Sequence, residues 1–187
     1  MNYIKKEKTM KITLETNRLI LRPFTLEDAF DMYHNWANDP KVTKYLTWNP
    51  HQNIEETKSI LNQWIKLYEK PERISFAIVL KDTKELIGSI DVCGYIEGVP
   101  VIGYALSKKH WNHGYMTEAC KKVISYLFLK GYQQVRIDAM VENIASNKVI
   151  QKCGGKYLDT IQHKFPLKNK TVLIHRYLIQ KDDFIAE

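Results

Sequence analysis

The chain has 187 residues, of which 44% are apolar and 26% charged, and it carries a net charge of +7. This length is enough for one domain with a sizeable core, and the composition is typical of a globular protein and excludes a disordered chain. No apolar run approaches the roughly 18 residues of a membrane span, and the N-terminus lacks the apolar stretch of a signal peptide, so we expect a cytoplasmic protein with no membrane partner.

The first third of the chain predicts one strand followed by two helices. The strand lies within residues 12–24, where Pro23 ends it. The first helix begins after Thr25, with Asp28 in the position of a capping box, and stops near Asn38-Asp39-Pro40. The second helix begins after Asn53, which is a suitable N-terminal cap.

The middle of the chain predicts a meander that runs into a βαβ unit. Short apolar segments at 75–80, 86–95 and 101–106 read as antiparallel strands separated by turns. An amphipathic helix at 117–130 and a strand at 135–141 follow. The strands on either side of this helix are therefore expected to be parallel.

A shorter helix that ends at Gly154-Gly155 and a hairpin of residues 156–163 and 171–179 complete the prediction. The class is α+β with a mixed sheet. No repeat or linker interrupts the chain, so we expect a single domain over residues 12–187 after a polar leader at 1–11.

The basic charge favours an anionic partner, such as a nucleic acid, a polyphosphate cofactor or an acidic protein. The charges are spread along the chain, which favours an ordinary basic surface over a dedicated nucleic-acid face. Cys93, Cys120 and Cys153 are far apart and form no CxxC pair, so we expect free thiols and neither a zinc site nor a redox motif.

The run from His110 to Cys120, HWNHGYMTEAC, allows three interpretations: a metal site, a histidine-based catalytic site and an anion-binding loop. His110 and His113 have no third ligand at a compact spacing, so we predict no metal. The zinc-protease motif HExxH is absent, and so is the motif GxSxG that carries the nucleophilic serine of many hydrolases. The run lies between a strand and a helix, where free backbone N–H groups and Gly114 can accept an anion closely. Spacing alone leaves an anion loop and an ordinary turn both open.

Three segments resemble one enzyme family. The segment IGYALSKKHWNHGYMTEACKKVISYLF resembles the acetyl-CoA-binding segment of the GNAT superfamily of N-acetyltransferases, and VENIASNKVIQKCGG resembles the asparagine-bearing segment that follows it. The opening TNRLILRPFTLEDAFDMYHNWANDPKV is similar to the branch of ribosomal-protein N-terminal (alanine/serine) acetyltransferases. The resemblance covers about residues 13–180. It implies a mixed, mostly antiparallel sheet that is splayed between its fourth and fifth strands and flanked by helices.

The resemblance also implies a set of residues that bind acetyl-CoA. Pantetheine would run along the exposed edge of the strand 101–106, and the backbone of the loop would hold the pyrophosphate. Asn143 would contact the pantetheine arm, although a helix cap is the alternative role for it. The full predicted set is Tyr104, Ala105, Leu106, Trp111, Asn112, His113, Gly114, Tyr115, Met116, Thr117, Asn143 and Asn147. Trp111 and Met116 depart from the general pattern of the family loop.

Catalysis is expected to depart from the usual pattern of the family. Many members place a tyrosine where this chain has Ile150, whereas the branch above resembles this chain in having Ser146, which would assist the departing thiolate or only cap a helix. The N–H of Leu106 would stabilise the oxyanion. Asp91 and Glu97 are the candidates for the general base.

The leading hypothesis is an enzyme, an acyltransferase that moves an acetyl group directly from acetyl-CoA to a primary amine on a protein N-terminus or a small molecule. Candidate acceptor-binding residues are Trp36, Tyr45 and Trp48. The alternative is a non-catalytic acyl-CoA-binding regulator. Nucleic acid is expected only indirectly, through a ribosomal protein, and the chain is expected to be a monomer or a homodimer.

Overall fold

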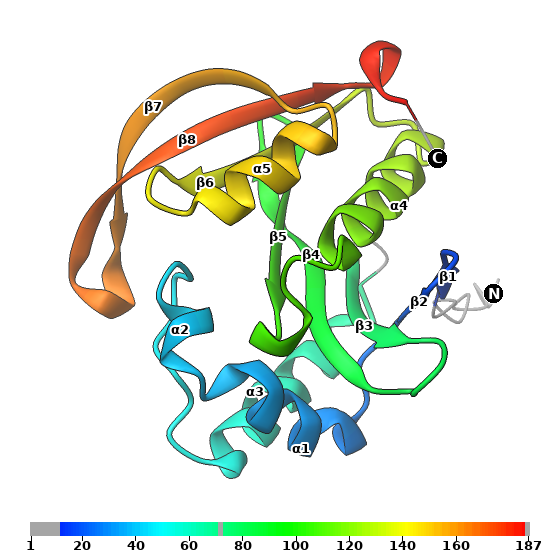
Figure 1. The fold of residues 1–187 in the computed structure, drawn as a ribbon, viewed down its shortest axis with the longest axis vertical. Coiled ribbons are helices and arrows are strands. Elements are labelled where there is room, and N and C mark those ends of the chain that lie inside the picture. Colours follow the sequence, from blue (N-terminus) through cyan, green and yellow to red (C-terminus); the bar gives the residue numbers. More distant parts are fainter. Residues whose placement is uncertain (1–11, 71–72, 186–187) are drawn as a thin grey trace, which may run out of the picture.

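The computed structural model describes residues 12–70 and 73–185, so the predicted polar leader at 1–11 lies outside the described residues. The fold is α+β, with one mixed eight-stranded sheet in the order β1-β2-β3-β4-β5-β6-β8-β7 (Figure 1). The strands are β1 (Leu14–Glu15), β2 (Leu19–Arg22), β3 (Ser75–Leu80), β4 (Leu86–Ile96), β5 (Val99–Leu106), β6 (Gln134–Met140), β7 (Lys156–Phe165) and β8 (Lys170–Gln180). The α-helices are α1 (Ala29–Met32), α2 (Pro40–Thr43), α3 (Ile54–Leu67), α4 (Tyr115–Leu129) and α5 (Ile144–Lys152).

The helical segment after Thr25 is less regular than predicted. It begins as a 3₁₀ turn, continues as α1 and ends in a π-helical stretch over Tyr33–Ala37. The capping role of Asp28 is confirmed, because its carboxylate accepts the N–H of Thr25 at 2.8 Å. After Asp39 the chain starts α2, which the prediction missed although Asp39 caps it and Pro40 occupies its first position.

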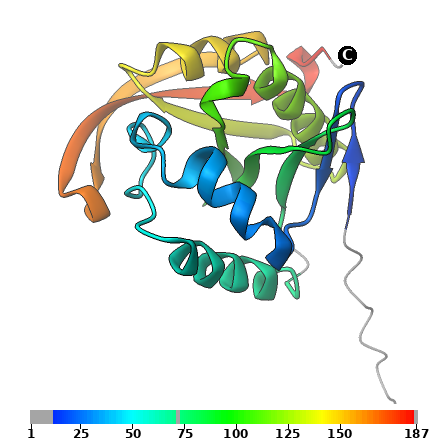
Figure 2. The same cartoon turned by 60° about the horizontal axis from the view of Figure 1, so that its bottom comes forward.

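Helices cover both faces of the sheet. Figure 2 shows α4 and α5 on one side, and α1 and α3 on the other. The first core lies under α4 and α5 and includes Ile90, Val123 and Ile137. The second lies under α1 to α3 and includes Trp36 and Leu61. The central strands therefore pack between two helical layers, with one core on each face.

The expected splay lies between β5 and β6. These strands are parallel and pair only at Val101 with Arg136 and at Ile102 with Ile137. Beyond these pairs β5 continues to Leu106 without a partner on that side. The prediction of a sheet splayed between the strands 101–106 and 135–141 is confirmed.

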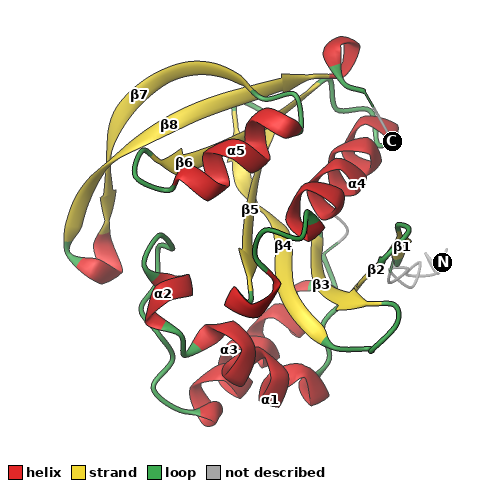
Figure 3. Ribbon diagram, viewed as in Figure 1, coloured by secondary structure: helices red, strands yellow, loops and turns green. Residues whose placement is uncertain are grey.

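The β7–β8 hairpin extends as a long arc whose tip approaches α2 (Figure 3). The Nζ of Lys168 at the tip donates to the carbonyl oxygen of Thr43 at 2.5 Å, and Asn49 donates to the carbonyl of Leu167 at 3.0 Å. Tyr45 packs against a small core at the same place. In the described ranges no helix has the length and apolar character that crossing a membrane requires.

Candidate functional site

A cleft of about 640 Å³ opens where β5 and β6 separate. Four segments build it: the end of β5, the loop and first turn of α4, helix α5 with the two residues before it, and the end of α2 with the residues that follow it. Its lining residues are Val42, Tyr45, Leu46, Tyr104, Ala105, Leu106, His110, Trp111, Asn112, Gly114, Tyr115, Met116, Thr117, Glu142, Asn143, Ile144, Ala145, Ser146, Lys148, Val149 and Lys152. Most of the predicted cofactor-binding residues are therefore brought together in one cavity.

The end of β5 presents backbone groups to this cleft. The carbonyl of Ala105 points at Gly88 on β4, where it would collide with a Cβ, and the N–H of Ser107 donates to Ile87 at 2.7 Å. Successive residues of a strand point their backbone groups to opposite edges. The N–H and C=O of Leu106 therefore face the splay, which is the orientation that the predicted oxyanion donor requires.

The loop before α4 places free N–H groups at the cleft. Gly114 is the N-cap of α4 and has a φ of +80°, and Asn112 is also left-handed with a φ of +63°. Tyr115, Met116 and Thr117 form the first turn, where backbone N–H groups have no acceptor within the helix. The positive end of the helix dipole lies at the same place, so this turn suits an anion.

Trp111 fixes the loop against β5. Its indole Nε1 donates to the carbonyl oxygen of Leu106 at 2.8 Å, so the ring spans the space between strand and loop. His113 is exposed, does not line the cleft, and has its Nδ1 2.7 Å from the carbonyl oxygen of Trp111. His110 lines the cleft, and its Nε2 lies 3.6 Å from Oε2 of Glu85, so its imidazole faces the β3–β4 turn as well as the cavity.

Ser146 and Tyr104 meet inside the cleft from opposite sides of the splay. The hydroxyl of Tyr104 on β5 lies 2.8 Å from Oγ of Ser146 on α5. Burial raises the pKa of Tyr104 well above its usual range, so the phenol stays protonated at neutral pH. A protonated phenol can donate to the serine oxygen and leave the serine proton free for another acceptor.

The two asparagines of the third segment differ in their surroundings. Asn143 lines the cleft and also caps α5, because its Oδ1 accepts the N–H of Ser146 at 3.2 Å. Asn147 is buried and does not line the cleft. Its Nδ2 donates to the carbonyls of Met140 and Asn143 at 3.0 and 2.8 Å, and its Oδ1 accepts the hydroxyl of Tyr177 at 2.7 Å. Asn147 therefore holds the turn between β6 and α5, and it lacks the exposure that cofactor contact requires.

The two acids predicted as bases lie away from the cleft. Glu97 is in the β4–β5 turn, nine residues from Leu106, which is roughly 30 Å along an extended strand. Asp91 pairs with Gly103 across β4 and β5 and forms an ion pair with Arg73 at 3.4 Å. Burial raises the pKa of Asp91, while Arg73 and Cys93 act in the opposite direction. Neither acid is among the described residues that line the cleft.

Of the three residues predicted to bind the acceptor, only Tyr45 is among the described residues that line the cleft. The role of Tyr45 as an acceptor wall stays a prediction. Trp36 is 0% exposed in the core under α1 to α3 and has no access to a ligand. Trp48 packs on the same core with its ring 5.0 Å from that of His51, and it is not part of the described lining.

Sequence reasoning missed Glu142, which is the one acid among the described residues that line the cleft. Extending the β5–β6 register from Val101 and Arg136 places residue 141 across the splay from Leu106, so Glu142 follows at the mouth of the splay. Lys148 and Lys152 line the cleft from α5. A register argument for the parallel pair would have found Glu142, whereas nothing local in the sequence marks it.

Comparison with known proteins agrees with this geometry. The profile of the acetyltransferase (GNAT) domain matches residues 18–156. The chain is 35% identical over 144 residues to the uncharacterized N-acetyltransferase YoaA of Bacillus subtilis. This match covers 75% of this chain and 81% of that protein. The chain is also 30% identical over 179 residues to the uncharacterized N-acetyltransferase p20 of Bacillus licheniformis. This match covers 92% of this chain and 98% of that protein.

Two solved structures share the fold. The ribosomal L7/L12 alpha-N-protein acetyltransferase RimL superposes with a TM-score of 0.80 at 18% identity, over 91% of this chain and 95% of that one. The microcin C7 self-immunity acetyltransferase MccE, in complex with acetyl-CoA and AMP, superposes with a TM-score of 0.78 at 20% identity, over 88% and 93%. With the matched profile and the two Bacillus relatives, the chain belongs to the GNAT family of N-acetyltransferases and is an acetyl-CoA-dependent acyltransferase.

Proposed function

We propose that this enzyme transfers an acetyl group from acetyl-CoA directly to a primary amine that enters the cleft. The observation that carries the proposal is the convergence of three features on one cavity: the open edge of β5 at Leu106, the free N–H groups at the start of α4, and the Tyr104–Ser146 pair. Each feature matches one requirement of acyl transfer from a thioester.

The cavity suits a coenzyme A molecule in size and in charge. Its volume of about 640 Å³ lies within the roughly 300–1,000 Å³ of small-molecule sites. The first turn of α4 would hold the pyrophosphate, and Gly114 allows close approach because it lacks a Cβ. Lys148 and Lys152 add positive charge to the same cleft from α5. The exposed backbone of β5 would bind pantetheine as an added strand.

Acetyl-CoA would supply the thioester, and the protein would supply the groups that stabilise charge around it. The N–H of Leu106 faces the splay and would stabilise negative charge on the carbonyl oxygen. Ser146 would donate its hydroxyl proton toward the departing sulfur. Tyr104 supports this role, because a hydrogen bond donated to Oγ strengthens the serine as a donor in turn.

Glu142 is our candidate for the group that receives the ammonium of the acceptor. It lines the cleft at the mouth of the splay, whereas Asp91 is paired with Arg73 and Glu97 lies at the far end of β5. A carboxylate at this place attracts a cation and can take up its proton, directly or through water. Tyr45 and Leu46, which follow α2, line the same cleft and add apolar groups to it. We therefore propose that the acceptor is a molecule whose primary amine lies next to an apolar group.

The proposal is tested by calorimetry with coenzyme A and by thiol release with a panel of amines. The panel contains a protein N-terminal peptide, a polyamine, an amino sugar and an amine-bearing peptide toxin. Similarity to RimL is a reason to include the N-terminal peptide. Turnover with at least one amine supports the proposal. Tight binding without turnover on any amine supports the non-catalytic regulator instead, and absence of coenzyme A binding contradicts both.

A further inference from the structure

Arg18 connects the N-terminal hairpin to the loop before α4. It lies in the turn between β1 and β2, and its Nη1 donates to the carbonyl oxygen of His113 at 3.0 Å. Its Nε donates to Oε2 of Glu118 at 2.7 Å, and its guanidinium carbon lies 4.4 Å from the centre of the Tyr115 ring. One side chain therefore contacts the loop at His113 and the start of α4 at Tyr115 and Glu118, from outside the cleft.

Glu118 is held by the hairpin through both of its carboxylate oxygens. Oε1 accepts the hydroxyl of Thr16 at 2.6 Å and the backbone N–H of Arg18 at 3.0 Å. The side chain of Glu118 is only 13% exposed. Burial alone would raise the pKa of Glu118, but the hydrogen bonds from Thr16 and Arg18 lower it overall, so the group is ionised at neutral pH.

An ionised carboxylate in this position opposes the binding of an anion. Glu118 lies in the first turn of α4, at the helix end that would receive the pyrophosphate. A like charge at that end weakens the binding of phosphate unless a cation compensates it. Arg18 is the cation in contact with it, since Nη2 also lies 2.7 Å from Oε2.

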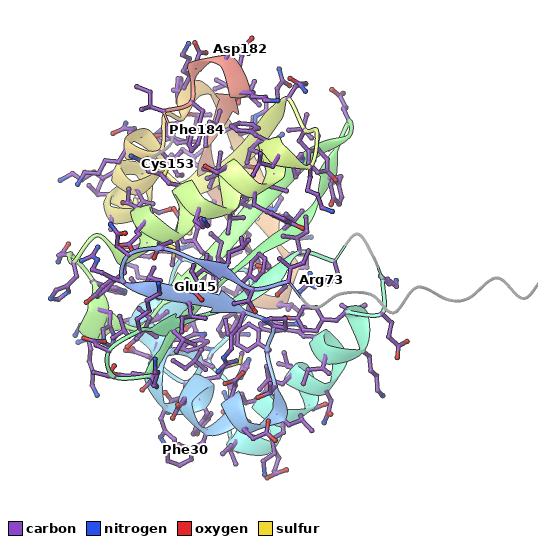
Figure 4. The ribbon with its side chains drawn as sticks, turned by 90° about the vertical axis from the view of Figure 1, so that its right-hand side faces the viewer. Glu15, Phe30, Arg73, Cys153, Asp182 and Phe184 are labelled. Atoms are coloured by element: carbon purple, nitrogen blue, oxygen red, sulfur yellow. The ribbon has the colours of Figure 1, made fainter. Side chains whose placement is uncertain are left out.

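We infer that Arg18 is a positioning residue for acetyl-CoA: it neutralises Glu118 and so allows the start of α4 to hold the pyrophosphate. This inference rests on the proposed placement of the cofactor. Neither Arg18 nor Glu118 is among the described residues that line the cleft, so both act through the loop. Figure 4 shows the hairpin, marked by Glu15, lying directly beside α4.

The first experiment compares coenzyme A affinity by calorimetry in four variants. Arg18→Ala should weaken binding about 5- to 150-fold, the usual range when a group outside a binding site is coupled to it. Arg18→Lys keeps the positive charge, so it should lose less affinity for coenzyme A than Arg18→Ala. Glu118→Gln removes the opposing charge and should bind at least as tightly as the wild type. The double variant Arg18→Ala with Glu118→Gln should bind more tightly than Arg18→Ala.

A matched control comes from the same hairpin. Glu15 forms an ion pair with Lys81 at 2.8 Å and has no described contact with the loop. Glu15→Gln should leave coenzyme A affinity unchanged. Melting temperatures of all variants are measured in parallel. If Arg18→Ala does not fold, the affinities of Arg18→Lys and Glu118→Gln are compared with that of the wild type instead.

The second experiment uses acetyl-pantetheine, a donor that lacks the pyrophosphate. Arg18→Ala should lower kcat/KM with acetyl-CoA and leave kcat/KM with acetyl-pantetheine unchanged. A merely structural brace predicts the same loss with both donors and weaker binding by Glu118→Gln, and either result would overturn the inference. If the wild type itself fails to bind coenzyme A, the proposed function fails and the role of Arg18 falls with it.

Discussion

Replacement of Gly114 by alanine should weaken coenzyme A binding without unfolding the protein. Gly114 has a φ of +80°, and a Cβ placed on it would meet its nearest atom, Nη2 of Arg18, at 3.5 Å, which is ordinary contact. Space therefore permits alanine, and the cost comes from the left-handed backbone. That cost is about 1–2 kcal/mol for a residue with a Cβ.

The strain should appear in binding because the loop can avoid it in the free protein. Gly114 is exposed, so an alanine there can leave the left-handed region until the cofactor requires the loop to return. A cost of about 1–2 kcal/mol corresponds to roughly a 5- to 30-fold loss of affinity. Valine, which is stiff at χ1, should reduce binding further, to a level that calorimetry does not detect.

Gly131 provides the matched control at the other end of the same helix. It follows the C-cap of α4, has a φ of +100°, and a Cβ on it would meet nothing within 4 Å. Gly131→Ala should lower the melting temperature while coenzyme A affinity stays at the wild-type value. If Gly114→Ala binds coenzyme A like the wild type, or if both variants lose affinity equally, the anion-binding role of the loop is refuted.

Four further predictions concern other parts of the site. Ser146→Ala should lower kcat by roughly 100-fold and change the KM for acetyl-CoA little; an unchanged kcat would exclude the serine as the donor to sulfur. Asn147→Ala, which removes three side-chain hydrogen bonds (to the carbonyls of Met140 and Asn143 and from the Tyr177 hydroxyl), should lower the free energy of unfolding by about 3 kcal/mol in urea titrations, roughly 1 kcal/mol for each bond. Burial lowers the pKa of His51 from 6.5, so the unfolded chain binds more protons and stability should fall as the pH drops below 6.5; His51→Gln should flatten this dependence, and an equally steep profile would exclude His51. Lys168→Ala frees the hairpin tip from α2 and should raise the KM for the amine without changing that for acetyl-CoA; equal effects on both would argue against a wall of the acceptor site.

The elements that could be predicted from the sequence are those with local signals. Asn53 accepts the N–H of Glu56 at 2.9 Å, as its type and position indicated, and α3 begins where expected. The βαβ unit followed from hydrophobic periodicity and from Gly131, which ends α4. The resemblance to GNAT enzymes supplied the splay, which no local pattern of residues reveals.

The elements that the sequence did not reveal depend on long-range register. Asp91 and Glu97 looked equivalent as acids on one strand and its turn, but the pairing of β4 with β5 separates them from the cleft. Glu142 reaches the cleft only because β6 runs parallel to β5. The contact of Lys168 with Thr43 joins segments 125 residues apart, so no window along the chain contains it.

The position of Ile150 explains why this chain does not carry a tyrosine there, as many members of the family do. Ile150 is 0% exposed, and a Cβ on Gly155 would lie only 2.5 Å from its Cγ2, so helix and turn are packed tightly around an aliphatic side chain. A tyrosine at 150 would overfill this core, at a cost of typically 1–3 kcal/mol. A phenol is nevertheless present in the cleft, because Tyr104 on β5 reaches across the splay to Ser146. The helix supplies the serine and the strand supplies the phenol. The hydroxyl pair therefore forms only when β5 and α5 are held at the correct separation, so the proposed role of Ser146 depends directly on the splay of the sheet.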